Sequence, residues 1–439
     1  MNKGSSLRVP IRPKNYYSEF FLIELKFKKY QKKVIDKNLS DVFSSHIRLA
    51  LSSLPYEIYK YSIERNNKIF FQSTLGLIRQ IFIFFFISLP VRFLSKKKIN
   101  IIHLPNMQHE TIFKLDSKKK KLNFIVEKNT GFILNFFLIY LIKKSKLLKK
   151  INLSFLISKE NGLKIFLKNQ NQLQIEIDRL VKLVLLFLKI TKTKNIINNN
   201  SDSIKGSILA LSGRRNNSKI IEFYHGFYNK NSLLGVYPTM ADFQIHWTKD
   251  VIDSFLPCLT TKSRKKYKFF GYPIKIRSNI KLNNSILILF PPISDISQNE
   301  SSKLVNDLIK IIHHFSLFSV VRVRFHPSIN KNEFNYYSKL IIKNGGAISF
   351  YKDALIDLKL SKMVLGFAST LLVTAIYNNI PALKISRSSY TYCDKVNEIS
   401  FKKIFDMFRT KKDITKFIKN FQFPKMKTFN YETFNKIIN

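Results

Sequence analysis

The feature that most constrains the fold is a regular alternation of short apolar runs and longer mixed segments between residues 285 and 385. Strands are predicted at 285–290, 319–325, 347–350, 363–366 and 382–385. Helices are predicted between them, at 300–315, 333–343, 353–358 and 371–377. Strands that alternate with helices indicate βαβ units and a parallel sheet. This part of the chain is therefore predicted to be an α/β domain.

The first half of the chain is less regular. The first 95 residues predict mostly helices, followed by strands at 100–105 and 122–126 and a helix at 131–146. The asparagine-rich stretch 191–203 predicts a polar loop or a local boundary. Further strands are predicted at 207–211, 219–224 and 242–247, and the run 268–273 closes this half. We expect the domain junction near 275–284 and a helical tail from residue 397.

The charge of the chain bears on its partners. Lys and Arg number 75 against 28 Asp and Glu, a formal net charge of +47. The cations are spread along the whole length, as an AT-biased coding sequence would also produce. So positive a surface attracts nucleotides, anionic lipid headgroups and nucleic acid. A nucleic-acid-binding protein is the weaker alternative, because no recognisable RNA- or DNA-binding module is present.

Cysteine usage and hydropathy indicate a cytoplasmic protein. Cys258 and Cys393 form neither a disulfide framework nor a zinc pattern, which fits a reducing compartment. Residues 1–14 lack the apolar segment of a secretory signal. The longest mostly apolar runs, 81–91, 132–142 and 180–188, are shorter than the roughly 18–20 residues that cross a bilayer. The run 81–87, with basic residues on both sides, is also compatible with a peripheral contact at the inner face of an anionic membrane.

The first candidate for chemistry is the segment Glu222-Phe223-Tyr224-His225-Gly226, a predicted strand that ends in an imidazole and a glycine. His225 has a side chain that can accept a proton near neutral pH. Gly226 permits a tight turn or a close approach of the backbone. A purely structural role for such a histidine remains an open alternative.

The second candidate is the strand end at 321–327. Alternation places Arg322, Arg324 and His326 on one face of this strand and apolar residues on the other. A central parallel strand is usually apolar on both faces. The two arginines therefore predict a bound anion, paired carboxylates, or an edge strand with solvated charges. We favour the anion.

The third candidate is the segment 366–370, Gly-Phe-Ala-Ser-Thr, between a predicted strand and a predicted helix. Gly366 is expected to allow a sharp turn. Ser369 or Thr370 can cap the helix and also donate to a phosphate oxygen, although a plain N-cap is the alternative. Ligands of open α/β sheets bind at the carboxyl ends of the strands. The second and third candidates together predict a nucleotide or nucleotide-sugar site.

The order of these motifs carries a resemblance to a known group of enzymes. Between about residues 206 and 390 the chain resembles bacterial surface-polysaccharide glycosyltransferases of the GT-B type, and within them it is similar to bacterial sialyltransferases. CDP-glycerol glycerophosphotransferases share a comparable pair of motifs. The matching residues are His225-Gly226, Tyr237-Pro238 with Ala241-Asp242, Gly271-Tyr272-Pro273, Arg324-Phe325-His326-Pro327, Gly366 with Ser369-Thr370, and Ile380-Pro381.

The resemblance implies an α/β fold with two Rossmann-like domains facing a cleft, the GT-B architecture, and a helical N-terminal segment. The implied division is a helical segment at 1–95, an acceptor-side α/β domain at 96–278, a nucleotide-sugar-binding domain at 279–395, and C-terminal helices at 396–439 that pack back.

The resemblance also implies roles for individual residues. His326 of the His-Pro motif, which Pro327 completes, would contact the nucleotide phosphate, and Ser369 and Thr370 would complete that cradle. The acidic-acidic-glycine motif that supplies the base in the sialyltransferases is not found. We therefore expect His225 or, less favoured, Glu222 to be the base.

The function implied is transfer of a sugar, with a CMP-sugar favoured, from a nucleotide-sugar donor to a cell-surface polysaccharide (capsule or lipopolysaccharide) or lipid-linked acceptor. An Asp-x-Asp pair is absent, so we expect inverting transfer without a metal and with no cofactor beyond the donor. His313 and His314 are interpreted as packing residues. The alternatives are a CDP-glycerol-type polyol-phosphate transferase and a basic nucleic-acid- or membrane-binding protein without catalysis.

Overall fold

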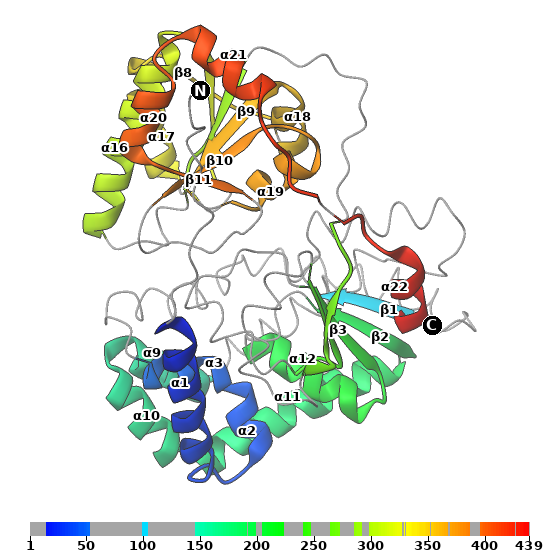
Figure 1. Ribbon diagram of the computed structural model, residues 1–439. Coiled ribbons are helices and arrows are strands. Elements are labelled where there is room, and N and C mark those ends of the chain that lie inside the picture. Colours follow the sequence, from blue (N-terminus) through cyan, green and yellow to red (C-terminus); the bar gives the residue numbers. More distant parts are fainter. Residues whose placement is uncertain are drawn as a thin grey trace. The chain divides into compact units, whose positions relative to one another are not determined.

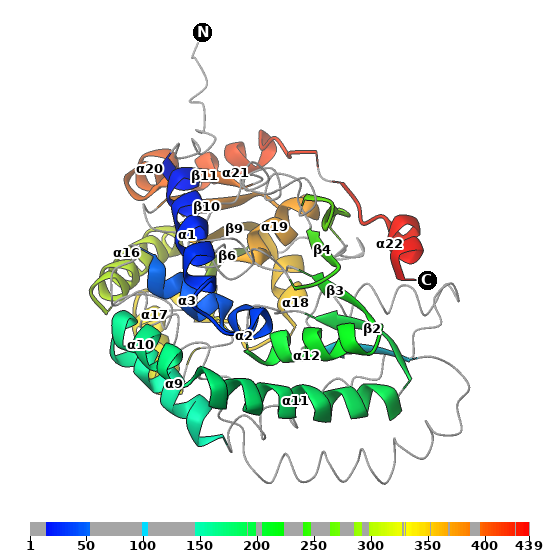
Figure 2. The ribbon, with the colours of Figure 1, turned by 90° about the horizontal axis from the view of Figure 1, so that it is seen from below.

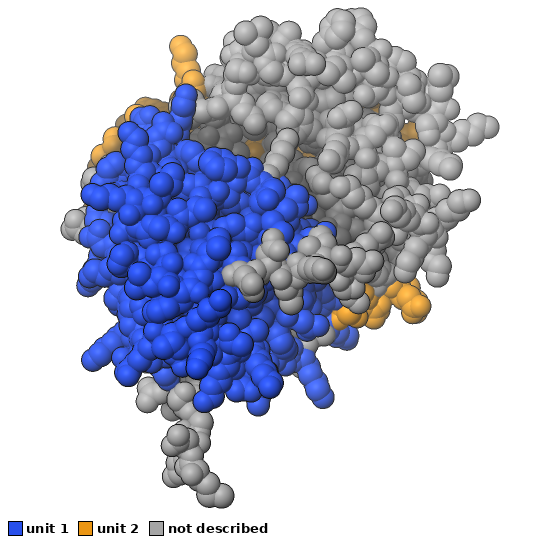
Figure 3. Space-filling view, turned by 90° about the horizontal axis from the view of Figure 1, so that it is seen from above, with its two compact units in different colours: residues 1–13, 226–229, 274–427 blue, residues 14–225, 230–273, 428–439 orange. Residues whose placement is uncertain are grey.

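The computed structural model describes two compact units (Figure 3). Unit 1 is built from the described residues between 274 and 427, and unit 2 from those between 15 and 272 together with 428–438. The described residues are 15–52, 99–103, 145–190, 192–198, 204–223, 240–246, 264–272, 285–291, 298–326, 329, 331–351, 353–367, 369–386, 396–425 and 427–438.

Unit 2 contains a 5-stranded sheet in the order β1-β2-β3-β4-β5, with every neighbouring pair parallel. Ile196 and Ile197 of the second strand pair with Ile220 and Ile221 of the third, and all four side chains are buried. The strands are β1 (Ile99–His103), β2 (Thr193–Asn198), β3 (Lys219–Phe223), β4 (Phe243–His246) and β5 (Tyr267–Phe269).

In most helices of unit 2 apolar side chains recur every three to four residues, and some begin at a polar N-cap, as at Ser145 and Ser158. Helix α11 (Gln170–Ile190) buries Leu173, Ile177, Val184 and Leu188 on one face. Figure 2 shows it running alongside α12. The remaining helices are α1 (Asn15–Gln31), α2 (Lys37–Val42), α3 (Ser44–Leu51), α9 (Lys146–Ile157), α10 (Lys159–Lys168), α12 (Ile204–Arg215) and α22 (Tyr431–Ile438).

Two predictions in unit 2 are wrong. The run 207–211, predicted as a strand, lies inside α12, in which every residue from Ile204 to Gly213 is buried. An all-buried helix lacks the polar face that would distinguish it from a buried strand. The stretch 191–203, predicted as a polar loop, contains β2. Pairing on both sides, with β1 and β3, outweighs the low strand propensity of asparagine there.

Unit 1 contains a 6-stranded sheet in the order β11-β10-β9-β6-β7-β8, again with every neighbouring pair parallel. Read from β8 and numbered within the unit, this order is 3-2-1-4-5-6, the doubly wound arrangement of dinucleotide-binding domains. The strands are β6 (Ser285–Leu289), β7 (Val320–Arg324), β8 (Gly346–Ile348), β9 (Ser361–Gly366), β10 (Ala382–Ser386) and β11 (Asn397–Ser400).

Helices cover both faces of this sheet. In Figures 1 and 2, α16, α17 and α20 lie on one side and α18 and α19 on the other. The helices are α16 (Gln298–Ser316), α17 (Lys331–Lys343), α18 (Ala354–Lys359), α19 (Thr370–Tyr377), α20 (Phe401–Met407) and α21 (Lys411–Lys419). The prediction of an α/β fold is confirmed, and so is the alternation of strands and helices between 285 and 385.

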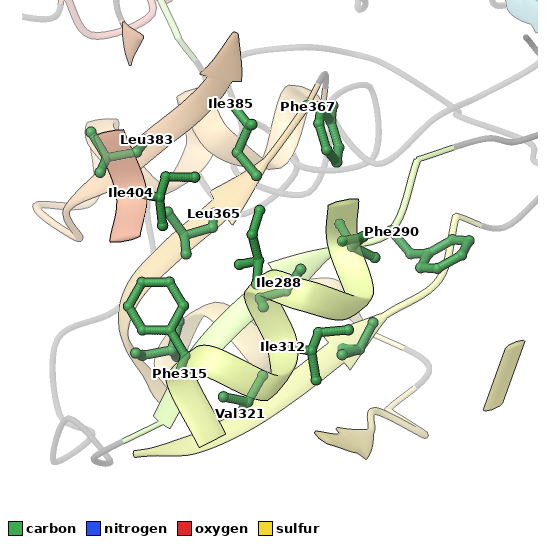
Figure 4. Packing of buried hydrophobic residues seen from close by; sticks show 14 of the residues in the cluster. Ile288, Phe290, Ile312, Phe315, Val321, Leu365, Phe367, Leu383, Ile385 and Ile404 are labelled. Atoms are coloured by element: carbon green, nitrogen blue, oxygen red, sulfur yellow. The ribbon is translucent and has the colours of Figure 1, made fainter. Parts of the chain in front are cut away.

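The core of unit 1 fills the space between the sheet and the first group of helices. Ile288 and Leu365 project from the two central strands toward Ile312 and Phe315 of α16 (Figure 4). Val321, Val323 and Phe325 point to this same side, since successive side chains of a strand alternate between faces. The intervening residues Arg322 and Arg324 are therefore left on the face of α18 and α19.

The C-terminal tail differs from the prediction. Residues 397–400 were expected to be helical, but they form the edge strand β11, parallel to β10. Helices α20 and α21 then belong to unit 1. Helix α22 belongs to unit 2, where Phe434 is fully buried against Phe223 and Phe270.

Some predicted segments lie outside the described residues. They include the predicted strand at 122–126, residues 131–144 of the helix predicted at 131–146, and the apolar runs 81–91 and 132–142. None of the helices that the structure describes is long and apolar enough to cross a membrane. The domain bounds and the cleft implied by the resemblance remain predictions.

Candidate functional site at the carboxyl edge of the unit 1 sheet

The strand order of unit 1 defines where a ligand is expected. Strand β6 continues to β7 and β8 on one side, and the chain then crosses to β9 and continues to β10 and β11 on the other. The crevice at the carboxyl ends of β6 and β9 is the topological switch point of such a sheet, where ligands of open α/β sheets bind. The predicted residues at the ends of β7 and β9 flank this point.

The register places those two strand ends at the same level. Arg324 pairs with Leu289, and Leu289 pairs with Gly366. Adjacent strands lie about 4.8 Å apart, so the backbones of β7 and β9 are separated by about 10 Å across β6. His326, two residues beyond Arg324, and Ser369, three residues beyond Gly366, therefore both lie just past the same edge of the sheet.

The arginines of β7 have a partner within the protein. Strand β7 lies between β6 and β8, so the interpretation as an edge strand with solvated charges is wrong. Arg324 Nη1 lies 2.6 Å from Asp357 Oδ2, and Arg322 Nη1 lies 3.9 Å from Asp357 Oδ1. The Asp357 side chain, on α18, is fully buried. Of the three explanations offered by the sequence, the paired carboxylate is therefore present, and a bound anion is no longer needed to explain the arginines.

The end of β7 is held by backbone hydrogen bonds. Phe290 N donates to Arg324 O at 2.9 Å, and Ile329 N donates to His326 O at 3.1 Å. The second bond joins His326, directly after the strand, to the residue three positions later. His326 is half-buried. Pro327, the other half of the motif, lies outside the described residues.

The segment between β9 and α19 contains a helix cap. Ser369 Oγ accepts a hydrogen bond from Leu371 N at 3.2 Å and is the N-cap of α19. Thr370 is the first residue of the helix, and its carbonyl accepts from Thr374 Oγ1. The N-cap interpretation is confirmed. The phosphate role stays a prediction, which the position of the helix N-terminus at the carboxyl edge favours.

Gly366 has a packing role, and the sharp turn expected of it stays a prediction. Its backbone is outside the left-handed region, since the described glycines with positive φ are Gly271 and Gly345. A Cβ at residue 366 would lie 3.0 Å from Leu289 Cβ. A glycine here thus lets β9 approach the Leu289 side chain of β6.

In unit 2 the candidate base Glu222 is part of a buried polar chain. Its side chain accepts a hydrogen bond from Gln244 Nε2 at 3.0 Å, and Gln244 Oε1 lies 2.9 Å from His246 Nε2. Because the amide oxygen can only accept, His246 Nε2 donates. Burial lowers the pKa of His246 to about 3, so its ring is neutral. The Glu222 carboxylate is therefore already held by a neighbour on β4.

Other motif residues of unit 2 have structural contacts. Asp242 Oδ2 accepts from Ile220 N at 2.8 Å, which joins the starts of β3 and β4. Gly271 has a φ of 86°, a conformation that favours glycine. Tyr272 pairs with Thr428 of the C-terminal segment. The preferred base, His225, lies outside the described residues, so its role remains a prediction.

Three polar residues were missed by the sequence interpretation: Asp357, Gln244 and His246. The alternation Phe-Gln-Ile-His in β4 could have indicated a polar face within a buried strand. Asp357 gave no signal, because a single acidic residue in a short helix is typical of an exposed surface.

Of the two α16 histidines predicted to pack, His314 does so and His313 does not. His314 packs edge-on against the rings of Phe318 and Phe405, and its Nε2 lies 2.7 Å from Phe408 O. His313 is exposed. Across the described part of the chain, no group of three or more His, Cys, Asp or Glu side chains could hold a metal ion.

Neither a protein-family model nor a curated protein sequence matches the chain. Among solved structures it is similar to UDP-GlcNAc 2-epimerase from Neisseria meningitidis bound to UDP-GlcNAc, with 11% identity, 78% of this chain and 98% of that chain covered, and a TM-score of 0.46. It is also similar to MurG of Acinetobacter baumannii, with 7% identity, 74% and 94% covered, and a TM-score of 0.38.

A third similar structure is the lipopolysaccharide outer core galactosyltransferase WaaB in its apo form. It shares 12% identity, with 60% of this chain and 75% of that chain covered and a TM-score of 0.36. At these identities and TM-scores the likeness is one of fold and not of activity.

Proposed function

We propose that the protein is a glycosyltransferase that moves a sugar from a nucleotide-sugar donor to a cell-surface polysaccharide or lipid-linked acceptor. The observation that carries the proposal is the doubly wound strand order of unit 1, with predicted phosphate-binding residues at both strand ends beside its switch point. The site consists of His326 after β7 and of Ser369 and Thr370 at the N-terminus of α19.

The chemistry of these groups suits a departing nucleotide phosphate. The N-terminus of α19 presents backbone N–H groups and a positive dipole end to an anion. The Ser369 hydroxyl uses its oxygen to accept from Leu371 N and keeps its proton for a phosphate oxygen. Imidazole and hydroxyl donors fixed by the fold stabilise the charge that develops on the leaving group, so transfer can proceed without a metal.

His225 is the proposed base, which would take the proton of the acceptor hydroxyl as the sugar is transferred with inversion. Glu222 is the weaker candidate, because Gln244 already donates to its carboxylate inside the sheet. The donor proposed is a CMP-sugar. A CDP-glycerol-type polyol-phosphate transferase is the second candidate, since it would use the same phosphate contacts with a different transferred group.

A contact with the inner side of the cytoplasmic membrane is proposed for the exposed face of α9 in unit 2. On α9 the exposed residues Lys146, Lys150, Leu153 and Ile157 follow the spacing of one helix face. Leu153 and Ile157 are 58% and 59% exposed. Apolar side chains beside lysines suit an interface with anionic lipid. Cosedimentation with phosphatidylglycerol vesicles is expected, and Leu153→Ser/Ile157→Ser should weaken it. Equal binding by this variant would contradict the contact.

The function is tested by thermal unfolding of the protein in the presence of CMP, CDP, UDP, GDP and their sugar conjugates. A ligand that binds only the folded state raises the melting temperature. We expect one nucleotide to stabilise the wild type and to lose most of that effect in His326→Ala. His313→Ala, at an exposed position of α16, is the matched control and should respond as the wild type does.

If no nucleotide stabilises the protein but RNA does, with an affinity that falls steeply with salt, the glycosyltransferase proposal fails in favour of nucleic-acid binding.

A further inference from the structure

Asp357 is a fully buried carboxylate beside the proposed nucleotide site. Besides pairing with Arg324 Nη1, it accepts a hydrogen bond from the Ser349 hydroxyl, whose Oγ lies 2.6 Å from each carboxylate oxygen. A buried charge is tolerated only when it is paired and hydrogen-bonded. These contacts therefore fix the Asp357 side chain and, with it, the guanidinium group of Arg324.

The cluster formed by Asp357, its two arginines and Ser349 connects several strands. Arg324 Nη1 also donates to Tyr351 O at 2.8 Å. The backbone carbonyl of Asp357 accepts from Arg322 Nη2 at 3.1 Å and from Ser361 Oγ at 2.6 Å. Asp357 thus connects β7, the segment after β8, and the start of β9. Both β7 and β9 carry proposed phosphate contacts at their carboxyl ends.

We propose that Asp357 is a positioning residue for the donor phosphate, acting through Arg324 on the strand end that carries His326. This inference rests on the proposed function. The cluster contains two guanidinium groups and one carboxylate, so Asp357→Asn adds one unit of positive charge beside the site. Attraction alone would then tighten the binding of an anion. A positioning role predicts the opposite sign.

The test measures dissociation constants by calorimetry for the nucleotide that the wild type binds and for its parent nucleoside. Asp357→Asn is expected to weaken nucleotide binding by roughly tenfold to a hundredfold, as the loss of one hydrogen bond to a charged phosphate does. The affinity for the nucleoside should not change. Glu398→Gln is the matched control, because Glu398 pairs with Lys384 at 3.6 Å on the same sheet and should leave nucleotide binding unaltered.

A double-mutant cycle separates positioning from a general structural effect. If Asp357 acts through Arg324, Asp357→Asn causes no further loss of nucleotide affinity in an Arg324→Gln background. Equal or tighter nucleotide binding by Asp357→Asn would overturn the inference, as would two losses that simply add.

Removal of one partner from a buried ion pair can prevent folding. If Asp357→Asn does not fold, Ser349→Ala is measured instead, because it deletes one hydrogen bond to Asp357. Weaker nucleotide binding by Ser349→Ala supports the inference, and unchanged binding overturns it. Failure of the wild type to bind any nucleotide would refute the proposed function and this inference with it. If the wild type binds a nucleotide and Asp357→Asn binds it equally well, only the inference about Asp357 is refuted.

Discussion

Substitution of Ser369 by alanine separates the two roles that the structure allows for this residue. The variant loses the hydrogen bond from Leu371 N to Ser369 Oγ and with it the N-cap of α19. Loss of an N-cap serine costs about 1 kcal/mol of stability. In a domain of about 150 residues that corresponds to a fall in the melting temperature of roughly 2–4 °C. Thr410→Ala is the matched control, because Thr410 caps α21 in the same unit, where it accepts from Asp413 N.

Ser369→Ala and Thr410→Ala are expected to differ in how strongly the nucleotide stabilises them. A ligand present at a hundred times its dissociation constant stabilises the folded state by about 2.7 kcal/mol. A hydrogen bond to a charged phosphate contributes about 1.5–3 kcal/mol, so its loss weakens binding roughly tenfold to a hundredfold. At the same ligand concentration the stabilisation of Ser369→Ala then falls to between about 0.4 and 1.4 kcal/mol.

The assay is thermal unfolding of the wild type and both variants with and without the nucleotide that the wild type binds. Thr410→Ala should lose stability and keep the full response to nucleotide, whereas Ser369→Ala should lose both. If Ser369→Ala keeps the wild-type response, Ser369 is only a helix cap and the phosphate cradle is wrongly placed.

His225→Ala should bind nucleotide as the wild type does but fail to release it from the sugar donor in a turnover assay; retained turnover would exclude His225 as the base. Gly366→Val should reduce stability in urea by about 1–3 kcal/mol, because its Cβ would crowd Leu289; an unchanged midpoint would refute the close packing. Burial lowers the pKa of His46 to about 4 and of His246 to about 3. The unfolded chain, titrating near about 6.5, binds these protons first as the pH falls. The free energy of unfolding of unit 2 should therefore be highest, as far as these histidines contribute, above about pH 6.5. It should decrease toward pH 4 by up to about 1.4 kcal/mol per pH unit for each histidine. A free energy that stays constant over this range would contradict the burial of both rings.

The regular half of the chain could be predicted because its signals are local. From β6 to β10, strands that are apolar on at least one face are separated by turn residues and by helices with one polar face. Asn379, with a φ of 59°, ends α19 where the sequence Asn-Asn-Ile-Pro predicts an end. The alternation that separates Arg322 and Arg324 from Val321 and Val323 is likewise set by the geometry of one strand.

Long-range pairing explains what could not be predicted. Strand β2 exists because two neighbouring strands pair with it, and nothing local to its asparagines indicates them. Likewise, the pairing of Arg324 with Asp357 joins residues 33 positions apart in the sequence. The arginines alone favoured an external anion, since the carboxylate that neutralises them becomes a neighbour only after β8 and α18 have folded back on β7.

Hydrogen exchange, resolved along the chain and measured with and without the stabilising nucleotide, locates the nucleotide site. We expect the nucleotide to slow exchange in the segments that end β7 and begin α19, at 322–330 and 366–377, and to leave exchange in α21 unchanged. Protection confined to unit 2, or absent from both of those segments while the nucleotide is bound, would contradict a nucleotide site at the carboxyl edge of the unit 1 sheet.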